Sequence, residues 1–225
     1  MERFFNMDNK FFNFMGRIAD LVMLNVVCII CCLPIVTIGA SLTALHYVTL
    51  KMARNEEAYI IRSFFKSFKD NFKQATIINV IMLIAGALLY FDLSIVNNMQ
   101  GTMGKVLFVL LFVLVFLYSF IFLYIYPVLA KFYNTIRNTF VNAFLMAIRH
   151  LPYTILMLIV TAAPVAVFFI PSAQVQSMVL MLFIMMGASL LAFVNAHFFV
   201  KIFDNYVPKE EEDTPEEISS DNASV

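Results

Sequence analysis

Polar side chains inside long apolar runs are the residues of this sequence best placed to do chemistry. Asp92 is a carboxylate in the run 75–97, Asn25 lies in the middle of the run 18–36, and His46 lies in a short run with hydroxyl side chains nearby. Such groups are costly in an apolar medium and often mark ion, proton or solute sites. We therefore predict that Asp92, Asn25 and His46 contribute to a ligand or ion site. The structural alternatives are that Asp92 lies at a headgroup layer and that Asn25 hydrogen-bonds between helices.

The three cysteines form the other cluster with chemical potential. Cys28, Cys31 and Cys32 share one face of a helix. They would suit a thiolate metal site or a redox switch, but no histidine or carboxylate lies within a turn of them. We therefore predict that they pack as small apolar residues, and we predict no disulfide and no metal site.

Catalytic motifs are missing from the sequence. It contains no Walker A loop, no HExxH, no GxSxG and no pair of carboxylates within an apolar run. We therefore predict a protein that is not an enzyme and that needs no cofactor.

Composition indicates where these polar residues are held. Of the 225 residues, 62% are hydrophobic and 13% are charged, with 25 phenylalanines, 14 methionines and no tryptophan. Soluble domains are less apolar and carry about twice that charged fraction, roughly 25%. These values exclude a disordered protein, a disulfide scaffold and a nucleic-acid-binding domain, so no nucleic-acid partner is expected. Apolar runs of about 20 residues match the length that a helix needs to cross a bilayer.

The sequence therefore predicts an all-α, polytopic membrane helix bundle, with a single domain over residues 1–203. The six predicted transmembrane helices cover about residues 18–36, 38–54, 75–97, 105–130, 151–171 and 175–203. In the alternative there are four spans plus a re-entrant hairpin at 18–53, which protein or water would have to cover. Pro34 ends or bends the first span. Gly39 follows in a tight turn, where we expect backbone angles that other residues avoid.

Three shorter stretches alternate apolar and charged residues at helical spacing, at about 4–15, 58–73 and 134–150. The second has an aromatic stripe beside a basic stripe, formed by Arg62, Phe65, Lys66, Phe68, Lys69, Phe72 and Lys73. We predict amphipathic helices at the cytoplasmic face of the membrane, where this surface contacts anionic lipid. The alternative is a docking helix for a protein partner.

Charge is divided unevenly along the chain. Before residue 204 there are 14 basic and seven acidic residues, and from 204 onward there are one basic and eight acidic residues. In the predicted topology every basic residue except Lys105 falls on one side, so the positive-inside rule places both termini in the cytoplasm. The acidic segment 204–225 is predicted to be a disordered cytoplasmic tail.

Two motifs carry a family resemblance. The turn LPIVTIGAS, with Pro34, Thr37 and Gly39, and the stretch FFKSFKDNFKQA at 64–75 resemble the YesL family of bacterial integral membrane proteins. This family has no established activity, and its genes often accompany carbohydrate importers of the ABC type. The resemblance implies a protein of the bacterial cytoplasmic membrane with an accessory or regulatory role in carbohydrate uptake, with importer subunits as partners.

Two other functions stay open. An autonomous small-solute transporter or channel would use the intramembrane polar residues, and a lipid-organising structural protein would use the aromatic and basic stripes. Either protein could form a homo-oligomer.

Overall fold

The computed structural model describes residues 10–56 and 59–206, and within them the chain is all helical, with no strand. The α-helices are α1 (Lys10–Cys32), α2 (Ile38–Ala53), α3 (Ile60–Asn97), α4 (Thr102–Lys131), α5 (Ile136–Arg149), α6 (Leu151–Ala166), α7 (Ala173–Leu182) and α8 (Ala188–Phe203). Short 3₁₀ turns cover Ile35–Thr37 and Val167–Phe169, and a π-helical segment, Phe183–Gly187, joins α7 to α8. The predicted all-α class is confirmed.

Five helical stretches are long and apolar enough to cross a membrane. They are Phe14–Cys32, Ile35–Ala53, Ile60–Asn97, Thr102–Lys131 and Ala173–Phe203. A sixth crossing requires α5 and α6 to act as one broken span, since these two helices are bent by 100° at their junction. The chain is therefore a polytopic membrane protein, with five spans or up to six among the described residues.

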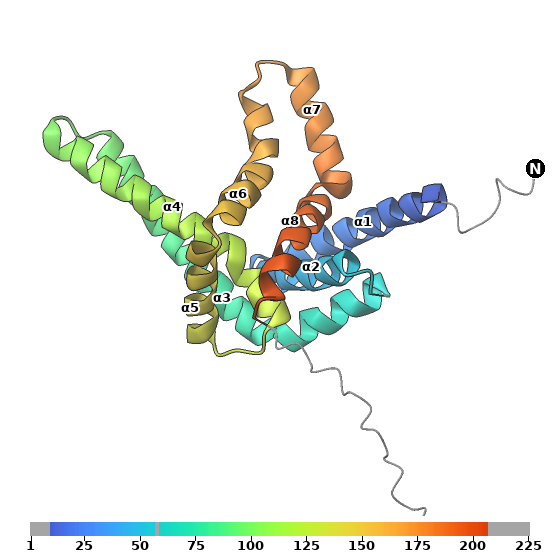
Figure 1. Ribbon diagram of the computed structural model, residues 1–225. Coiled ribbons are helices and arrows are strands. Elements are labelled where there is room, and N and C mark those ends of the chain that lie inside the picture. Colours follow the sequence, from blue (N-terminus) through green and yellow to red (C-terminus); the bar gives the residue numbers. More distant parts are fainter. Residues whose placement is uncertain (1–9, 57–58, 207–225) are drawn as a thin grey trace, which may run out of the picture.

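The helices radiate from a shared base. Figure 1 shows α1, the hairpin formed by α3 and α4, and the hairpin formed by α6 and α7 pointing in three directions away from it. Helix α2 lies at the centre and packs against α1, α3, α4 and α8. The buried core is concentrated in this base, while the outer parts of the hairpins expose apolar side chains.

The turn before α2 determines how closely α2 approaches α3. Helix α1 ends at Cys32, so the prediction that Pro34 ends or bends this span is confirmed. The Thr37 hydroxyl donates to the carbonyls of Cys31 at 2.6 Å and Pro34 at 2.7 Å. The expectation of unusual backbone angles at Gly39 is wrong, because Gly39 lies within α2 and only Gly101 has a positive φ among the described glycines.

Gly39 has a steric role instead. A Cβ at this position would lie 2.4 Å from the Ala75 carbonyl oxygen and 2.7 Å from Asn79 Cβ. Contacts this short cannot be accommodated without moving the α3 backbone, so the glycine is what lets α2 and α3 pack so closely.

Two predicted boundaries differ from the structure. The amphipathic stretch 58–73 and the span 75–97 form one continuous helix, α3, because no glycine or proline separates them. Of the predicted helix 4–15, residues 4–9 lie outside the described residues, and residues 10–15 form the first part of α1. The third stretch, 134–150, corresponds to α5. Of the predicted tail, residues 207–225 lie outside the described residues.

Candidate functional site

A cavity of about 480 Å³ lies at the junction of α2, α4, α6 and the α7–α8 segment. Its walls are mainly leucine, phenylalanine and alanine, and none of its lining residues is charged. Its polar lining residues are His46, Tyr118, Ser119, Tyr126, Thr161 and Asn195. An apolar pocket of about 300–1,000 Å³ with a few polar groups is the usual form of a small-molecule site.

His46 is the polar residue that α2 contributes to this cavity. Its ring lies edge-on to Phe199, with 6.3 Å between ring centroids. The Nδ1 atom is fully buried and has no hydrogen-bond partner. The Nε2 atom also forms no hydrogen bond, but it is not among the fully buried polar atoms, and the side chain as a whole is half-buried. His46 therefore lines the cavity with a ring whose nitrogens have no hydrogen-bond partner.

Asn195 is the polar residue that α8 contributes. Its Nδ2 donates to Thr161 Oγ1 at 3.0 Å, and the Thr161 hydroxyl donates to the Met157 carbonyl at 2.7 Å. The Asn195 side chain is 3% exposed, and its Oδ1 has no partner. A buried polar atom without a partner is uncommon and costs free energy, so it requires an explanation.

Two tyrosines of α4 connect the cavity to α3, and Tyr126 is also connected through α3 to the turn LPIVTIGAS. Tyr126 Oη donates to Asn79 Oδ1 at 3.1 Å, and Asn79 Nδ2 donates to the Ile35 carbonyl at 3.2 Å. Tyr118 Oη donates to the Met82 carbonyl at 3.1 Å. The turn, α3 and the cavity wall thus form one hydrogen-bonded unit.

Asn25, a predicted site residue, lies in the contact between α1 and α8. It is fully buried, donates to the Ile184 carbonyl at 2.7 Å and accepts from the Ser189 amide at 3.0 Å. The Ser189 hydroxyl in turn donates to the Leu21 carbonyl at 2.7 Å. Asn25 thus satisfies backbone groups around the π-helical segment, which is the arrangement of an interhelical hydrogen bond.

Asp92 lies apart from both of these residues. It is exposed on the outer part of α3, near the turn to α4, and does not line the cavity. The structure therefore places Asp92, Asn25 and His46 in three different surroundings. The cavity instead brings His46 together with Asn195 and Thr161. The sequence analysis did not predict these two residues as site residues. Each of them is a polar residue within an apolar helix, which is a signal that the sequence contains. That they lie near His46, however, follows only from the packing of α8 and α6.

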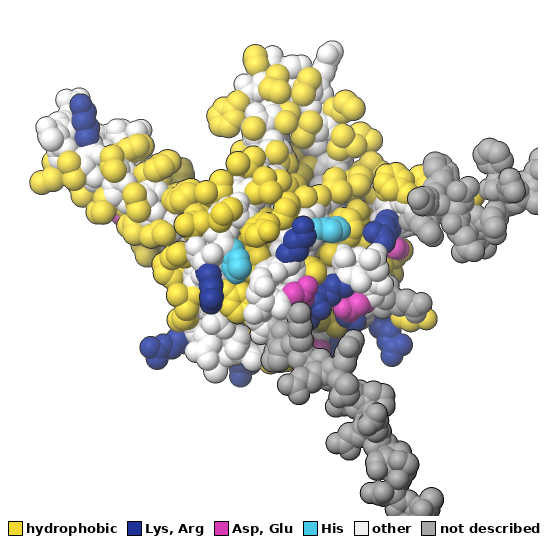
Figure 2. Space-filling model, in the orientation of Figure 1, with side chains coloured by type: hydrophobic (Ala, Val, Ile, Leu, Met, Phe, Trp, Pro, Cys, Tyr) yellow, Lys and Arg dark blue, Asp and Glu magenta, His cyan; other side chains and the backbone are white. Residues whose placement is uncertain are grey.

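The basic and aromatic stripes of α3 are largely exposed. Phe64 and Ser67 face the core, and Phe68 is half-buried. The exposed members are Arg62, Phe65, Lys66, Lys69, Phe72 and Lys73. Figure 2 shows basic side chains gathering around the base of the molecule, below the apolar hairpins.

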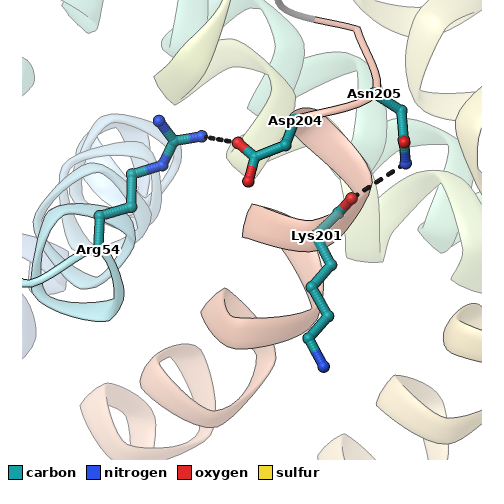
Figure 3. Close-up of polar contacts among 4 residues, drawn as sticks. All are labelled: Arg54, Lys201, Asp204 and Asn205. Atoms are coloured by element: carbon teal, nitrogen blue, oxygen red, sulfur yellow. Dashed lines mark hydrogen bonds and ion pairs between the residues drawn. The ribbon is translucent and has the colours of Figure 1, made fainter.

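The ends of α2 and α8 meet at this basic side. Arg54, which follows α2, forms an ion pair with Asp204, which follows α8 (Figure 3). Among the side chains that the structure describes, no other ion pair is present. Next to it, Asn205 Nδ2 donates to the Lys201 carbonyl at 3.0 Å.

The cysteines are free thiols in the described structure. Cys28 is buried, with its sulfur 4.0 Å from both the Cys32 sulfur and the Ser41 carbonyl oxygen. Across the part of the chain that the structure describes, no three histidine, cysteine or carboxylate side chains are grouped so that they could hold a metal ion.

Comparison with family models gives a match over the first part of this architecture. Residues 21–93 match a family model described as "Protein of unknown function, DUF624". The matched region runs from α1 to the outer part of α3, and so includes the motif turn, His46 and the basic stripe. No curated protein and no solved structure matches the chain.

Proposed function

We propose that this protein is a non-enzymatic accessory or regulatory component of bacterial carbohydrate uptake. Its match to the DUF624 model agrees with the resemblance of its sequence motifs to YesL proteins, which carry this region. The carbohydrate context comes from the YesL resemblance, whose genes accompany ABC-type importers. The structure supports a component that binds a partner inside the membrane.

The apolar surface of the separated hairpins is the observation that carries this proposal. On the outer part of α4, Phe112 is 61% exposed and Val113 is 50% exposed, and on α6 Ile159 is 62% exposed. Hairpins that diverge in this way leave apolar faces free on several sides (Figures 1 and 2). Lipid chains are as apolar as these side chains, so in a bilayer the faces are covered either by lipid or by closely packed helices of another subunit. The faces thus offer a docking surface for transmembrane helices of an importer subunit.

The distribution of charge supports an orientation in the bacterial cytoplasmic membrane. Lys66, Lys69 and Lys73 lie at the base, whereas the far turn of the α3–α4 hairpin is followed by Lys105 alone. With α5 and α6 as one broken span the number of crossings is even, and the positive-inside rule then assigns the base and both termini to the cytoplasm. In that orientation the exposed stripe on α3 contacts anionic headgroups.

Co-purification tests this function. The protein is isolated in mild detergent from native cells after photo-crosslinking from position 112 or 159, with position 14 on α1 as an exposed control. We expect importer membrane subunits in stoichiometric amounts, crosslinked from the hairpin positions and not from position 14. A protein that is recovered alone, or only with further copies of itself, overturns the proposal.

An autonomous small-solute transporter or channel is the second candidate, and the cavity with its free His46 nitrogen favours it. This function predicts solute flux in reconstituted vesicles that His46→Phe or Asp92→Asn reduces. Flux equal to that of empty vesicles across a panel of sugars and small ions excludes it.

A further inference from the structure

We propose that the cavity between α2, α4, α6 and α8 binds a neutral lipid that carries a hydroxyl group, with His46 as its polar anchor. Diacylglycerol and long-chain alcohols share this chemistry. The inference is independent of any association with an importer.

The lining residues determine the charge of the ligand. No lysine, arginine, aspartate or glutamate lines the cavity, so it offers nothing to neutralise a phosphate, a carboxylate or an ammonium group. Placing an unpaired ion in an apolar cavity is strongly unfavourable. Phospholipid headgroups and ionic solutes are therefore poor ligands, and a neutral molecule is favoured.

The unpaired polar atoms determine how polar the ligand is. His46 lines the cavity and neither of its ring nitrogens has a hydrogen-bond partner, and the Oδ1 of Asn195 is likewise buried without one. The other polar lining groups already form hydrogen bonds within the protein: Tyr118 with Met82, Ser119 with Val115, Tyr126 with Asn79 and Thr161 with Met157. A sugar ring would lose hydration from several hydroxyl groups and recover few hydrogen bonds.

A single hydroxyl group fits this donor and acceptor pattern. It can donate to a bare ring nitrogen or accept from a protonated one, so it pairs with either neutral tautomer of His46. The rest of the ligand must be hydrocarbon, because the surrounding walls are formed by residues such as Leu45, Leu158 and Ala188.

Access to the cavity is from the bilayer. Two of its lining residues lie on the diverging hairpins and remain exposed: Phe122 on α4 is 44% exposed and Phe183, after α7, is 38% exposed. Phe122 and Phe183 belong to the stretches Thr102–Lys131 and Ala173–Phe203, which are apolar enough to span a membrane. A molecule dissolved in the hydrocarbon layer therefore reaches His46 without crossing water.

Binding is tested by native mass spectrometry of the full chain, released from an amine oxide detergent that has no hydroxyl group. The protein is titrated with oleyl alcohol, dioleoylglycerol and methyl oleate, the last of which has a similar hydrocarbon chain but no hydroxyl. We expect one saturable site for oleyl alcohol, dioleoylglycerol or both, and about tenfold weaker binding of methyl oleate, since a lost hydrogen bond in an apolar site has roughly this effect. Comparison of the titrations with dioleoylglycerol and with oleyl alcohol shows whether the site prefers a diacylglycerol or a long-chain alcohol.

Variants then assign the site to His46. His46→Phe should reduce binding of the hydroxyl ligand to the level of methyl oleate. His197→Phe is the matched control, because His197 lies on the exposed face of α8 and its Nδ1 contacts the Phe193 carbonyl oxygen outside the cavity. Equal binding of methyl oleate and the hydroxyl ligands, the absence of a one-to-one complex, or unchanged binding in His46→Phe would each overturn the proposal. The ligand comparison on the unmodified protein remains decisive if His46→Phe does not fold.

Discussion

The Tyr126 hydroxyl donates a 3.1 Å hydrogen bond to Asn79 Oδ1, and through it α4 is connected to the turn between α1 and α2. Asn79 completes the connection by donating to the Ile35 carbonyl, while the neighbouring Thr76 hydroxyl donates to the Val36 carbonyl at 3.3 Å. Both Asn79 and Tyr126 are buried. This connection gives the side-chain amide of Asn79 a structural role.

Asn79→Leu should destabilise the protein by about 1–2 kcal/mol, because it leaves the buried Tyr126 hydroxyl without its hydrogen-bond partner and removes one of the donors to the Ile35 carbonyl. Asn98→Leu is the control, since Asn98 is exposed and donates to Ser94 within its own turn. Thermal unfolding in detergent measures both variants. Equal midpoints for Asn79→Leu and the unmodified protein would contradict the structural role of this amide.

Gly39→Ala should destabilise the contact between α2 and α3 by about 1–3 kcal/mol, the usual cost of overpacking a core. Gly16→Ala provides a matched control in α1, since nothing lies within 4 Å of a Cβ at that position. There the substitution should be neutral or stabilising by about 0.5–1 kcal/mol, because alanine loses less conformational freedom in a helix. Thermal unfolding in detergent compares the two variants. A lower midpoint temperature of unfolding for Gly16→Ala than for Gly39→Ala would refute the steric argument.

Asn25→Leu should loosen the attachment of α1 to the π-helical segment. The variant removes the acceptor of the Ser189 amide and the donor to the Ile184 carbonyl, at a cost of about 1–2 kcal/mol. Hydrogen exchange should therefore increase locally over residues 183–189. If exchange rises evenly along the chain or does not change, Asn25 has no local anchoring role.

Replacing Lys66, Lys69 and Lys73 together by glutamine should weaken retention of anionic lipid without preventing membrane insertion. Each lysine near an anionic surface contributes about 1 kcal/mol. The measurement is the ratio of phosphatidylglycerol to phosphatidylcholine that remains bound in native mass spectra. Lys105→Gln, at the opposite end of the α3–α4 hairpin, should leave that ratio unchanged. A ratio that does not fall in the triple variant argues for a protein-docking role of this stripe.

Several features of the fold could be predicted because they depend on local chemistry. The length of an apolar run determines whether a helix can cross a bilayer, and this predicts the polytopic all-α class. A proline removes a backbone donor and excludes the helical conformation before it, so the end of α1 near Pro34 was predictable as well. The exposure of Lys66 and Lys69 follows from the cost of burying a charge.

The arrangement of polar groups was decided by tertiary packing. A helical residue such as His46 or Asn25 is surrounded by whatever neighbouring helices present, and those neighbours are up to 164 residues away in the chain, as for Asn25 and Ser189. Local sequence carries no information on such pairs. For this reason Asp92, Asn25 and His46 were predicted as candidate ligand or ion residues, whereas only packing could show that His46 shares a cavity with Asn195.

The role of Gly39 shows the same division. A glycine after a proline turn is recognisable from the sequence, and local rules favour an explanation in terms of backbone angles. The structure shows that its backbone is helical and that α3 lies against it. Run lengths and prolines determined which segments are helices, because those properties act within a few residues. How the helices meet, and hence which polar atoms face a cavity, was decided by side-chain volumes from distant parts of the chain, which take effect only once the helices pack.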